Sequence, residues 1–190
     1  MTRLFCSALV LAAGTAHAQV DRATTSPIGP EDVPALVTEE DPAAPSLTET
    51  ERVVRRTIER EGVHVVHFWA PWCGNSRAEY ETGWYEVVEA HPEVSFTFVT
   101  IWNDGDDGAE ALARYGIPES ATVLAQPDHG PSADRELRRR TFLGLPLSWT
   151  PTTWVFNRGG QLAYAFNYGE VSADMLRTAI ADARAGWEHD

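Results

Sequence analysis

The sequence predicts one α/β domain in which helices pack on a central sheet. From Ser46 onward, short segments rich in β-branched and aromatic residues alternate with segments whose apolar residues recur at helical spacing. This alternation is typical of helices flanking a sheet. The 190 residues, 43% of them hydrophobic, are enough for one such domain with a real core.

The chain begins with a segment that has the features of a secretory signal peptide. Arg3 precedes an apolar stretch, Leu4 to Ala13, and Ala16–Ala18 has the small-x-small pattern of a cleavage site. An uncleaved anchor is the alternative, but the stretch is too short to span a bilayer as a stable helix. We expect residues 1–18 to be removed with Cys6, leaving a periplasmic or secreted protein that is not inserted in the membrane.

The mature chain is expected to consist of a leader and one domain. Residues 19–45 contain five prolines among acidic and small residues, without apolar periodicity, which predicts a disordered or extended leader. The domain then covers residues 46–190. A helix is predicted over residues 47–61, because Ser46 with Glu49 and Thr48 with Glu51 both fit a capping box.

The next two elements frame the segment that carries chemistry. Val63–Trp69 is short and rich in β-branched and aromatic residues, as expected of a buried strand. Residues 75–90 are predicted to form a helix with an apolar stripe, weakened at Gly83 by about 1 kcal/mol relative to Ala. The stripe comprises Tyr80, Trp84, Val87 and Val88.

The remaining elements follow from the same patterns. They are a strand Val94–Trp102, a helix Ala109–Tyr115, a strand Ala121–Ala125, a hairpin of Thr153–Phe156 with Gln161–Phe166, and a last helix carrying Leu176, Ile180, Ala183 and Trp187. Residues 126–149 show no clear period. Four arginines crowd that segment, and they form either a solvated helical face or a docking patch for an acidic partner. These are Arg135, Arg138, Arg139 and Arg140.

Charge and composition exclude several classes of function. The formal net charge of −13 makes nucleic acid and anionic lipid surfaces poor partners. All 15 basic residues are arginine, so chemistry that needs a lysine amine is excluded. Two cysteines cannot build a disulfide scaffold or a multi-cysteine zinc site.

The remaining cysteine, Cys73, lies where the predicted strand meets the predicted helix. The N-terminus of a helix stabilises a thiolate, which predicts that Cys73 is a nucleophile near neutral pH. The Ser76 hydroxyl, one turn along, is placed to donate a hydrogen bond to the thiolate. The alternative is an inert, buried cysteine.

Trp69–Ser76, with the sequence WAPWCGNS, resembles the active-site segment of thioredoxins. The first motif cysteine is Cys73, the second is replaced by Ser76, and the usual intervening proline is Asn75. Residues 100–126 are similar to the helix and strand inserted in TlpA-type periplasmic proteins. Trp149–Thr153 resembles the family's cis-proline loop.

The resemblance implies a thioredoxin fold, with a central mixed sheet flanked by helices and a TlpA-type helix-strand insertion. It also implies a groove in which Thr150 offers its backbone to an extended substrate, with Gly169 nearby. His67 takes the position of a buried family aspartate, as a proton acceptor or as an ordinary strand histidine. The expected substrate-binding residues are Trp72, Gly74, Asn75, Trp149, Thr150 and Pro151.

A single motif cysteine limits the chemistry that the resemblance implies. Cys73 can form a mixed disulfide but needs an external or substrate thiol to resolve it. The expected partner is a cysteine-containing protein or a low-molecular-weight thiol. The alternative is a redox-inactive module that binds a protein partner around Cys73 and Pro151, and a homodimer linked through Cys73 is compatible with either hypothesis.

No metal or cofactor is expected. The acidic loop Asn103–Gly108 does not have the spacing of an EF-hand. A copper site at Cys73 lacks a second soft ligand, because the only methionine after the signal peptide is Met175 in the last helix.

Overall fold

A computed structural model describes residues 46–127, 134–167 and 170–185. The predicted signal peptide and leader therefore lie outside the described residues, as do Gly169 and Trp187. Within the described ranges, no helix is both long and apolar enough to span a bilayer.

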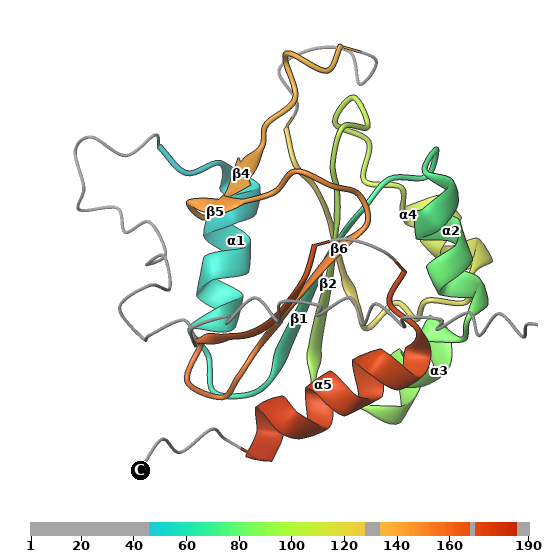
Figure 1. The fold of residues 1–190 in the computed structure, drawn as a ribbon, viewed down its shortest axis with the longest axis vertical. Coiled ribbons are helices and arrows are strands. Elements are labelled where there is room, and N and C mark those ends of the chain that lie inside the picture. Colours follow the sequence, from blue (N-terminus) through green and yellow to red (C-terminus); the bar gives the residue numbers. More distant parts are fainter. Residues whose placement is uncertain (1–45, 128–133, 168–169, 186–190) are drawn as a thin grey trace, which may run out of the picture. The chain divides into compact units, whose positions relative to one another are not determined.

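The five strands of the main sheet have the order β3-β2-β1-β6-β7 (Figure 1). β1 pairs in parallel with β2, which pairs in parallel with β3, while β6 runs antiparallel to both β1 and β7. The bounds are β1 His64–Trp69, β2 Ser95–Thr100, β3 Thr122–Ala125, β6 Thr152–Phe156 and β7 Leu162–Phe166. The predicted mixed sheet flanked by helices is confirmed, and each strand agrees with its predicted position to within two residues.

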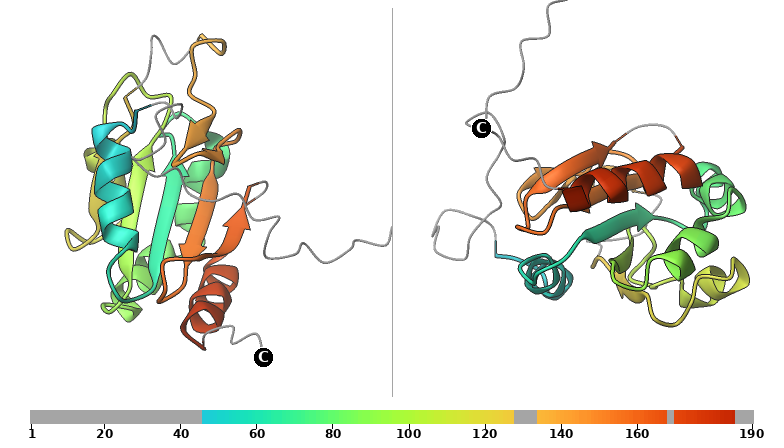
Figure 2. Two further views of the ribbon diagram at one scale, coloured as in Figure 1. Left: turned by 90° about the vertical axis from the view of Figure 1, so that its left-hand side faces the viewer. Right: turned by 90° about the horizontal axis from the view of Figure 1, so that it is seen from below.

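All six residues of β1 are buried because helices cover both faces of the sheet (Figure 2). Val66 and Phe68 face the core that includes Val54 and Ile58 of α1, Glu49–Ile58. The alternate residues of β1 point the other way, into a core shared with α3, Trp84–Ala90, and α5, Ala173–Ala185.

α1 begins at one of the two predicted capping boxes. Thr48 is the N-cap, and its hydroxyl accepts a hydrogen bond from the Glu51 amide at 3.1 Å. The Glu51 carboxylate accepts in return from the Thr48 amide at 2.8 Å. The helix is shorter than predicted at both ends, running from Glu49 to Ile58.

The prediction of one helix over residues 75–90 is wrong in one respect, because the segment forms two helices. α2 covers Gly74–Glu81, and α3 begins at Trp84. Between them, Gly83 has φ 97°, a left-handed conformation that cannot continue a right-handed helix. Gly83 therefore interrupts the helix, whereas the sequence pattern indicated only a weakening.

The short elements include α4, Ala109–Arg114, and a two-stranded sheet of β4, Thr141–Phe142, with β5, Leu145–Pro146. The arginine-rich segment before β4 is not helical, which corrects the interpretation of a solvated helical face. Leu143 and Leu147 are buried in the α1 core and draw this segment onto the domain.

Candidate functional site

Cys73 lies at the N-cap of α2, four residues after the end of β1. Its amide donates to the Ala70 carbonyl at 3.0 Å, and its own carbonyl accepts from the Arg77 amide at 3.2 Å. These two bonds close the turn between strand and helix. Cys73 is partly exposed and lies at the positive end of the helix.

The loop before β6 reaches the Cys73 side chain. Sγ donates to the Thr150 carbonyl oxygen at 3.3 Å, and the Thr150–Pro151 peptide bond is cis. The neighbouring Trp149 is 55% exposed. The structure thus brings Cys73 together with Thr150 and Pro151 although they are far apart in the sequence.

Ser76 lies one helical turn after Cys73 and is fully buried. Its hydroxyl oxygen accepts from the Ala70 amide at 3.4 Å, which ties α2 to the end of β1. A serine hydroxyl can accept and donate at once, so donation to a Cys73 thiolate stays a prediction. The other motif residues, Gly74 and Asn75, are exposed on the first turn of α2.

Two tryptophans and an arginine stack beside the cysteine. The Trp72 indole N–H donates to the Trp102 carbonyl at 2.9 Å, and the Arg138 guanidinium lies 5.4 Å from the Trp72 ring and 4.8 Å from the Trp102 ring. Trp102 has φ 55°, and its indole donates to the Arg139 carbonyl at 3.0 Å. Cation–π contacts of this kind contribute about 0.5–1 kcal/mol each near a surface.

His67 forms a buried pair with a glutamate that sequence reasoning missed. The His67 Nε2 and Glu79 Oε2 atoms lie 3.5 Å apart, and both side chains are almost fully buried. Burial lowers the pKa of His67 to about 3 and raises the pKa of Glu79 to about 8. The arrangement therefore favours a neutral imidazole beside a protonated carboxyl group.

Hydrogen bonds extend from this pair in two directions. His67 Nδ1 shares a 2.9 Å bond with the Thr153 hydroxyl, two residues after Pro151. On the other side, Glu79 Oε1 accepts from the Val171 amide at 2.6 Å. His67 is thus a buried histidine that hydrogen-bonds to Thr153, and its predicted role as a proton acceptor for the thiol stays a prediction.

The sequence contains some indications of the three site residues that were not predicted, Glu79, Arg138 and Trp102. Glu79 follows Ser76 by three positions, so both lie on one face of α2, and that face is buried. Arg138 belonged to the recognised arginine cluster, but its contact with Trp72 depends on an aperiodic segment. Trp102 was assigned to a strand end rather than to the site.

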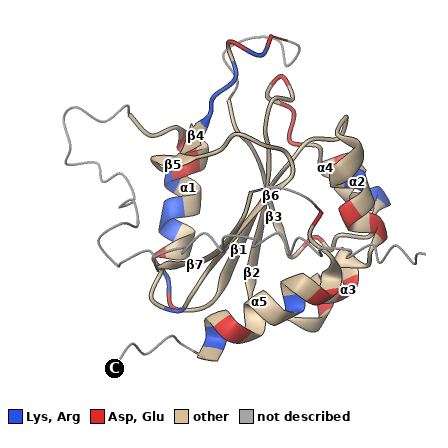
Figure 3. Cartoon of the chain, in the orientation of Figure 1, with Lys and Arg blue, Asp and Glu red and all other residues tan. Residues whose placement is uncertain are grey.

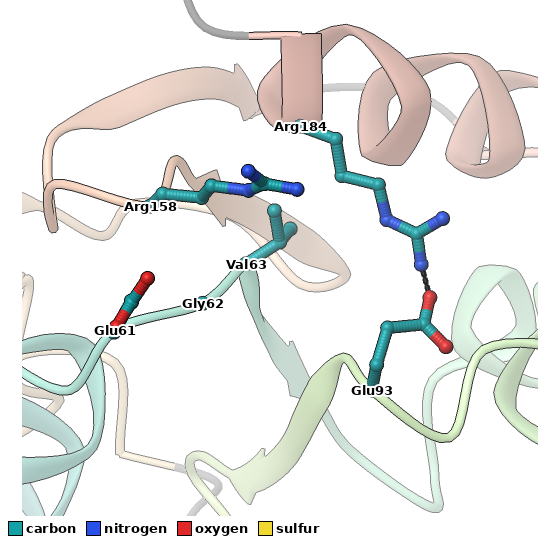
Figure 4. A pocket seen from close by; sticks show the side chains of 6 residues that line it. All are labelled: Glu61, Gly62, Val63, Glu93, Arg158 and Arg184. Carbon is teal, nitrogen blue, oxygen red and sulfur yellow. Dashed lines mark ion pairs between the residues drawn. The ribbon is translucent and has the colours of Figure 1, made fainter.

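A second polar region lies at the opposite end of β1 (Figure 4). It is a pocket of about 360 Å³ lined by Glu61, Gly62, Val63, Glu93, Arg158 and Arg184. Arg184 forms an ion pair with Glu93. Among the residues that the structure describes, no three His, Cys, Asp or Glu side chains are grouped so that they could hold a metal ion.

Comparisons with known proteins identify the fold. No protein-family model matches the sequence, and no curated protein matches it. Among solved structures, a DsbF homologue from Corynebacterium diphtheriae has a TM-score of 0.51 at 22% identity, with 66% of this chain and 74% of that chain covered.

A putative thioredoxin from Neisseria meningitidis also has a TM-score of 0.51, at 15% identity, with 70% of this chain and 82% of that chain covered. The five-stranded mixed sheet flanked by helices agrees with this likeness. The chain therefore has a thioredoxin-like fold.

Proposed function

We propose that this protein acts in thiol-disulfide exchange through a mixed disulfide at Cys73, which an external or substrate thiol resolves. The observation that carries the proposal is the position of the sulfur. It lies at the N-terminus of α2, is partly exposed, and is 3.3 Å from the Thr150 carbonyl of the loop before β6. A substrate sulfur attached to Cys73 would lie beside a backbone segment suited to pairing with an extended peptide.

The proposed reaction has two exchange steps. The Cys73 thiolate attacks one sulfur of a substrate disulfide, forms a mixed disulfide, and releases the other substrate sulfur as a thiolate. Position 76 is a serine, so no thiol is available one turn along the helix. A second thiolate, from the substrate or from solution, then attacks the mixed disulfide at the substrate sulfur and releases Cys73 as a thiolate.

The proposed setting is the periplasm or the exterior of the cell. The signal-like first 18 residues support it, because disulfide chemistry persists in oxidising compartments.

Mass spectrometry of mixed disulfides tests the proposal. The full mature chain is incubated with a peptide disulfide, and we expect one peptide to be added at Cys73 and released when glutathione is supplied. Ser76→Cys should shorten the lifetime of the adduct at least tenfold, because an internal thiol then resolves it.

Two results would contradict the proposal. One is a reduced Cys73 that forms no adduct although an alkylating reagent labels it. The other is an adduct that added thiol does not release. A module that binds without exchange would instead retain its partner after Cys73→Ala.

A further inference from the structure

Residues 135–140 lie at the cysteine end of the domain, where Arg138 contacts the Trp72 ring. We call residues 135–140 the arginine segment; four of its six residues are arginine (Figure 3). It is linked to the site by backbone contacts. Trp102 receives the Trp72 indole N–H on its carbonyl and donates its own indole N–H to the Arg139 carbonyl. The residue before Cys73 is therefore connected to the arginine segment through one tryptophan.

The arginine segment is also anchored on α1. Arg139 Nη2 lies 3.3 Å from Glu51 Oε2, and the other oxygen of Glu51 accepts from the Leu143 amide at 2.9 Å. Glu51 is 2% exposed, so this anchor is shielded from water. Arg139 thus holds the segment in place, while Arg135 and Arg140 are exposed on it.

Arg138 brings positive charge next to Trp72. Its guanidinium lies 5.4 Å from the ring of Trp72, the residue that immediately precedes Cys73. Stacking on two indoles restricts the guanidinium to one region of the surface. Residues 135–140 contain four arginines and one glutamate, so the charge of this segment differs in sign from that of the whole chain, which is −13.

Exposed apolar side chains adjoin the same region. Trp72, which precedes Cys73, is 47% exposed, and Trp149, which precedes Thr150, is 55% exposed. Leu137 of the arginine segment is 44% exposed. They come from three separate segments of the chain. An apolar surface of that spread suits a polypeptide better than a small thiol.

We propose that the arginine segment selects polypeptide substrates whose reacting cysteine is flanked by acidic residues. This inference rests on the proposed function and adds a substrate class to it. The apolar side chains and the Thr150 backbone take up the peptide, while Arg135, Arg138 and Arg140 attract its carboxylates. Charge complementarity of this kind acts mainly on the rate of association.

A matched set of peptides tests the selection. Three peptides of one length carry a single cysteine, activated as the same mixed disulfide, and differ only in glutamate, glutamine or arginine at the flanking positions. The measured quantity is the second-order rate of adduct formation at Cys73. The glutamate peptide should react about 10-fold faster than the glutamine peptide at low salt, with the ratio falling toward one at 0.5 M salt.

Variants assign the effect to the arginine segment. The double variant Arg135→Gln/Arg140→Gln and the single variant Arg138→Gln should each lower the ratio of glutamate to glutamine rates at least threefold. Arg158→Gln, at the opposite end of β1, is the matched control and should keep the wild-type ratio. Equal rates for all three peptides in the wild type, or an unchanged ratio in both variants, would overturn the proposal.

A binding measurement separates this inference from the proposed function. Cys73→Ala cannot exchange, yet its affinity for fluorescent, cysteine-free versions of the same peptides should still follow the order glutamate, glutamine, arginine. Charge-selective binding without exchange in the wild type would contradict only the proposed function. Exchange that prefers glutathione to every acidic peptide would contradict the polypeptide substrate class.

Discussion

The two ends of strand β1 use arginine in different ways. At its amino end, Arg184 forms an ion pair with Glu93 in a pocket that contains two arginines and two glutamates. At its carboxyl end, Arg138 stacks on two indoles beside a nucleophile. The Arg184–Glu93 pair links two segments of the surface, whereas packing on two indole rings keeps the Arg138 guanidinium close to the residue that precedes Cys73. We therefore expect the carboxyl end of β1, and not its amino end, to bind a ligand.

Among variants at the two ends of β1, removal of the nucleophile should have the largest effect, which is on covalent adduct formation. Cys73→Ala is expected to abolish covalent adduct formation completely, because the described residues contain one free cysteine. Glu93→Gln, in the opposite pocket, should leave the rate of adduct formation within about twofold of the wild type, since it is distant from the sulfur. Intact-mass spectrometry of both variants after incubation with a peptide disulfide measures this difference.

Gly108→Ala should destabilise the cysteine end strongly. Gly108 has φ 67°, and an added Cβ would lie 2.7 Å from the Trp69 ring at the end of β1. Overpacking of this kind costs about 1–3 kcal/mol, with further cost from the left-handed backbone. Gly159→Ala, where φ is not in the left-handed region, should change the free energy of unfolding by less than about 0.5 kcal/mol. Urea titration of both variants provides the measurement.

The His67–Glu79 pair should make stability depend on pH in two opposite directions. Between pH 4.5 and about 8 the folded state holds an extra proton on Glu79, so stability falls as pH rises. Between pH 3 and 6.5 the folded state binds fewer protons at His67, so stability falls as pH decreases. The two effects cancel between pH 4.5 and 6.5, where burial of the pair lowers stability least.

The variant Glu79→Gln tests whether Glu79 causes the loss of stability above pH 6.5. One proton gives a slope of at most about 1.4 kcal/mol per pH unit, and the variant should lose the decline between pH 6.5 and 8 while it keeps the decline in acid. The free energy of unfolding of the wild type and the variant, measured across pH 3 to 9, tests this expectation. A parallel decline of both proteins above pH 6.5 would show that another group causes it.

Loss of the α1 cap should have a smaller effect. Thr48→Ala removes the hydroxyl that accepts from the Glu51 amide, together with its 3.1 Å bond to Gln126, and should cost about 1 kcal/mol. Thr48→Ser keeps a capping hydroxyl and is the matched control. Thermal unfolding of the two variants should differ by several degrees if the cap is responsible.

Removing the ion pair at the amino end of β1 should have the smallest effect. Arg184 and Glu93 are 32% and 52% exposed, and partly exposed pairs contribute about 0.2–1 kcal/mol. Arg184→Gln should therefore lower the free energy of unfolding slightly, and the difference should shrink in 0.5 M salt. A loss above about 2 kcal/mol would show that Arg184 stabilises the fold by more than a solvated charge pair.

Local signals in the sequence predicted most of the fold. The capping box at Thr48 and the fully buried β1 were correctly predicted from residue types alone. The break at Gly83 was missed because an apolar stripe continues across it, and only the left-handed backbone reveals it. β4 and β5 are two residues each, too short for any period to show.

Those parts of the candidate site that are contiguous in the sequence could be predicted. Those that the fold brings together from distant segments could not. The motif around Cys73 could be identified along the chain, and the likeness of the Pro151 loop to a known family placed it nearby. The pairing of His67 with Glu79 depends on a strand meeting a helix at one point in space. The stacking of Arg138 depends equally on a segment without periodicity.

The carboxylate of Glu51 couples two parts of the molecule. Its two oxygens accept from the Thr48 amide at the start of α1, from the Leu143 amide before β5, and from Arg139. The start of α1 and the anchor of the arginine segment therefore depend on one buried group. Substitutions at Thr48 and Arg139 should not be additive in a double-mutant cycle, and a change at the helix cap should alter peptide selection at a site that it does not touch.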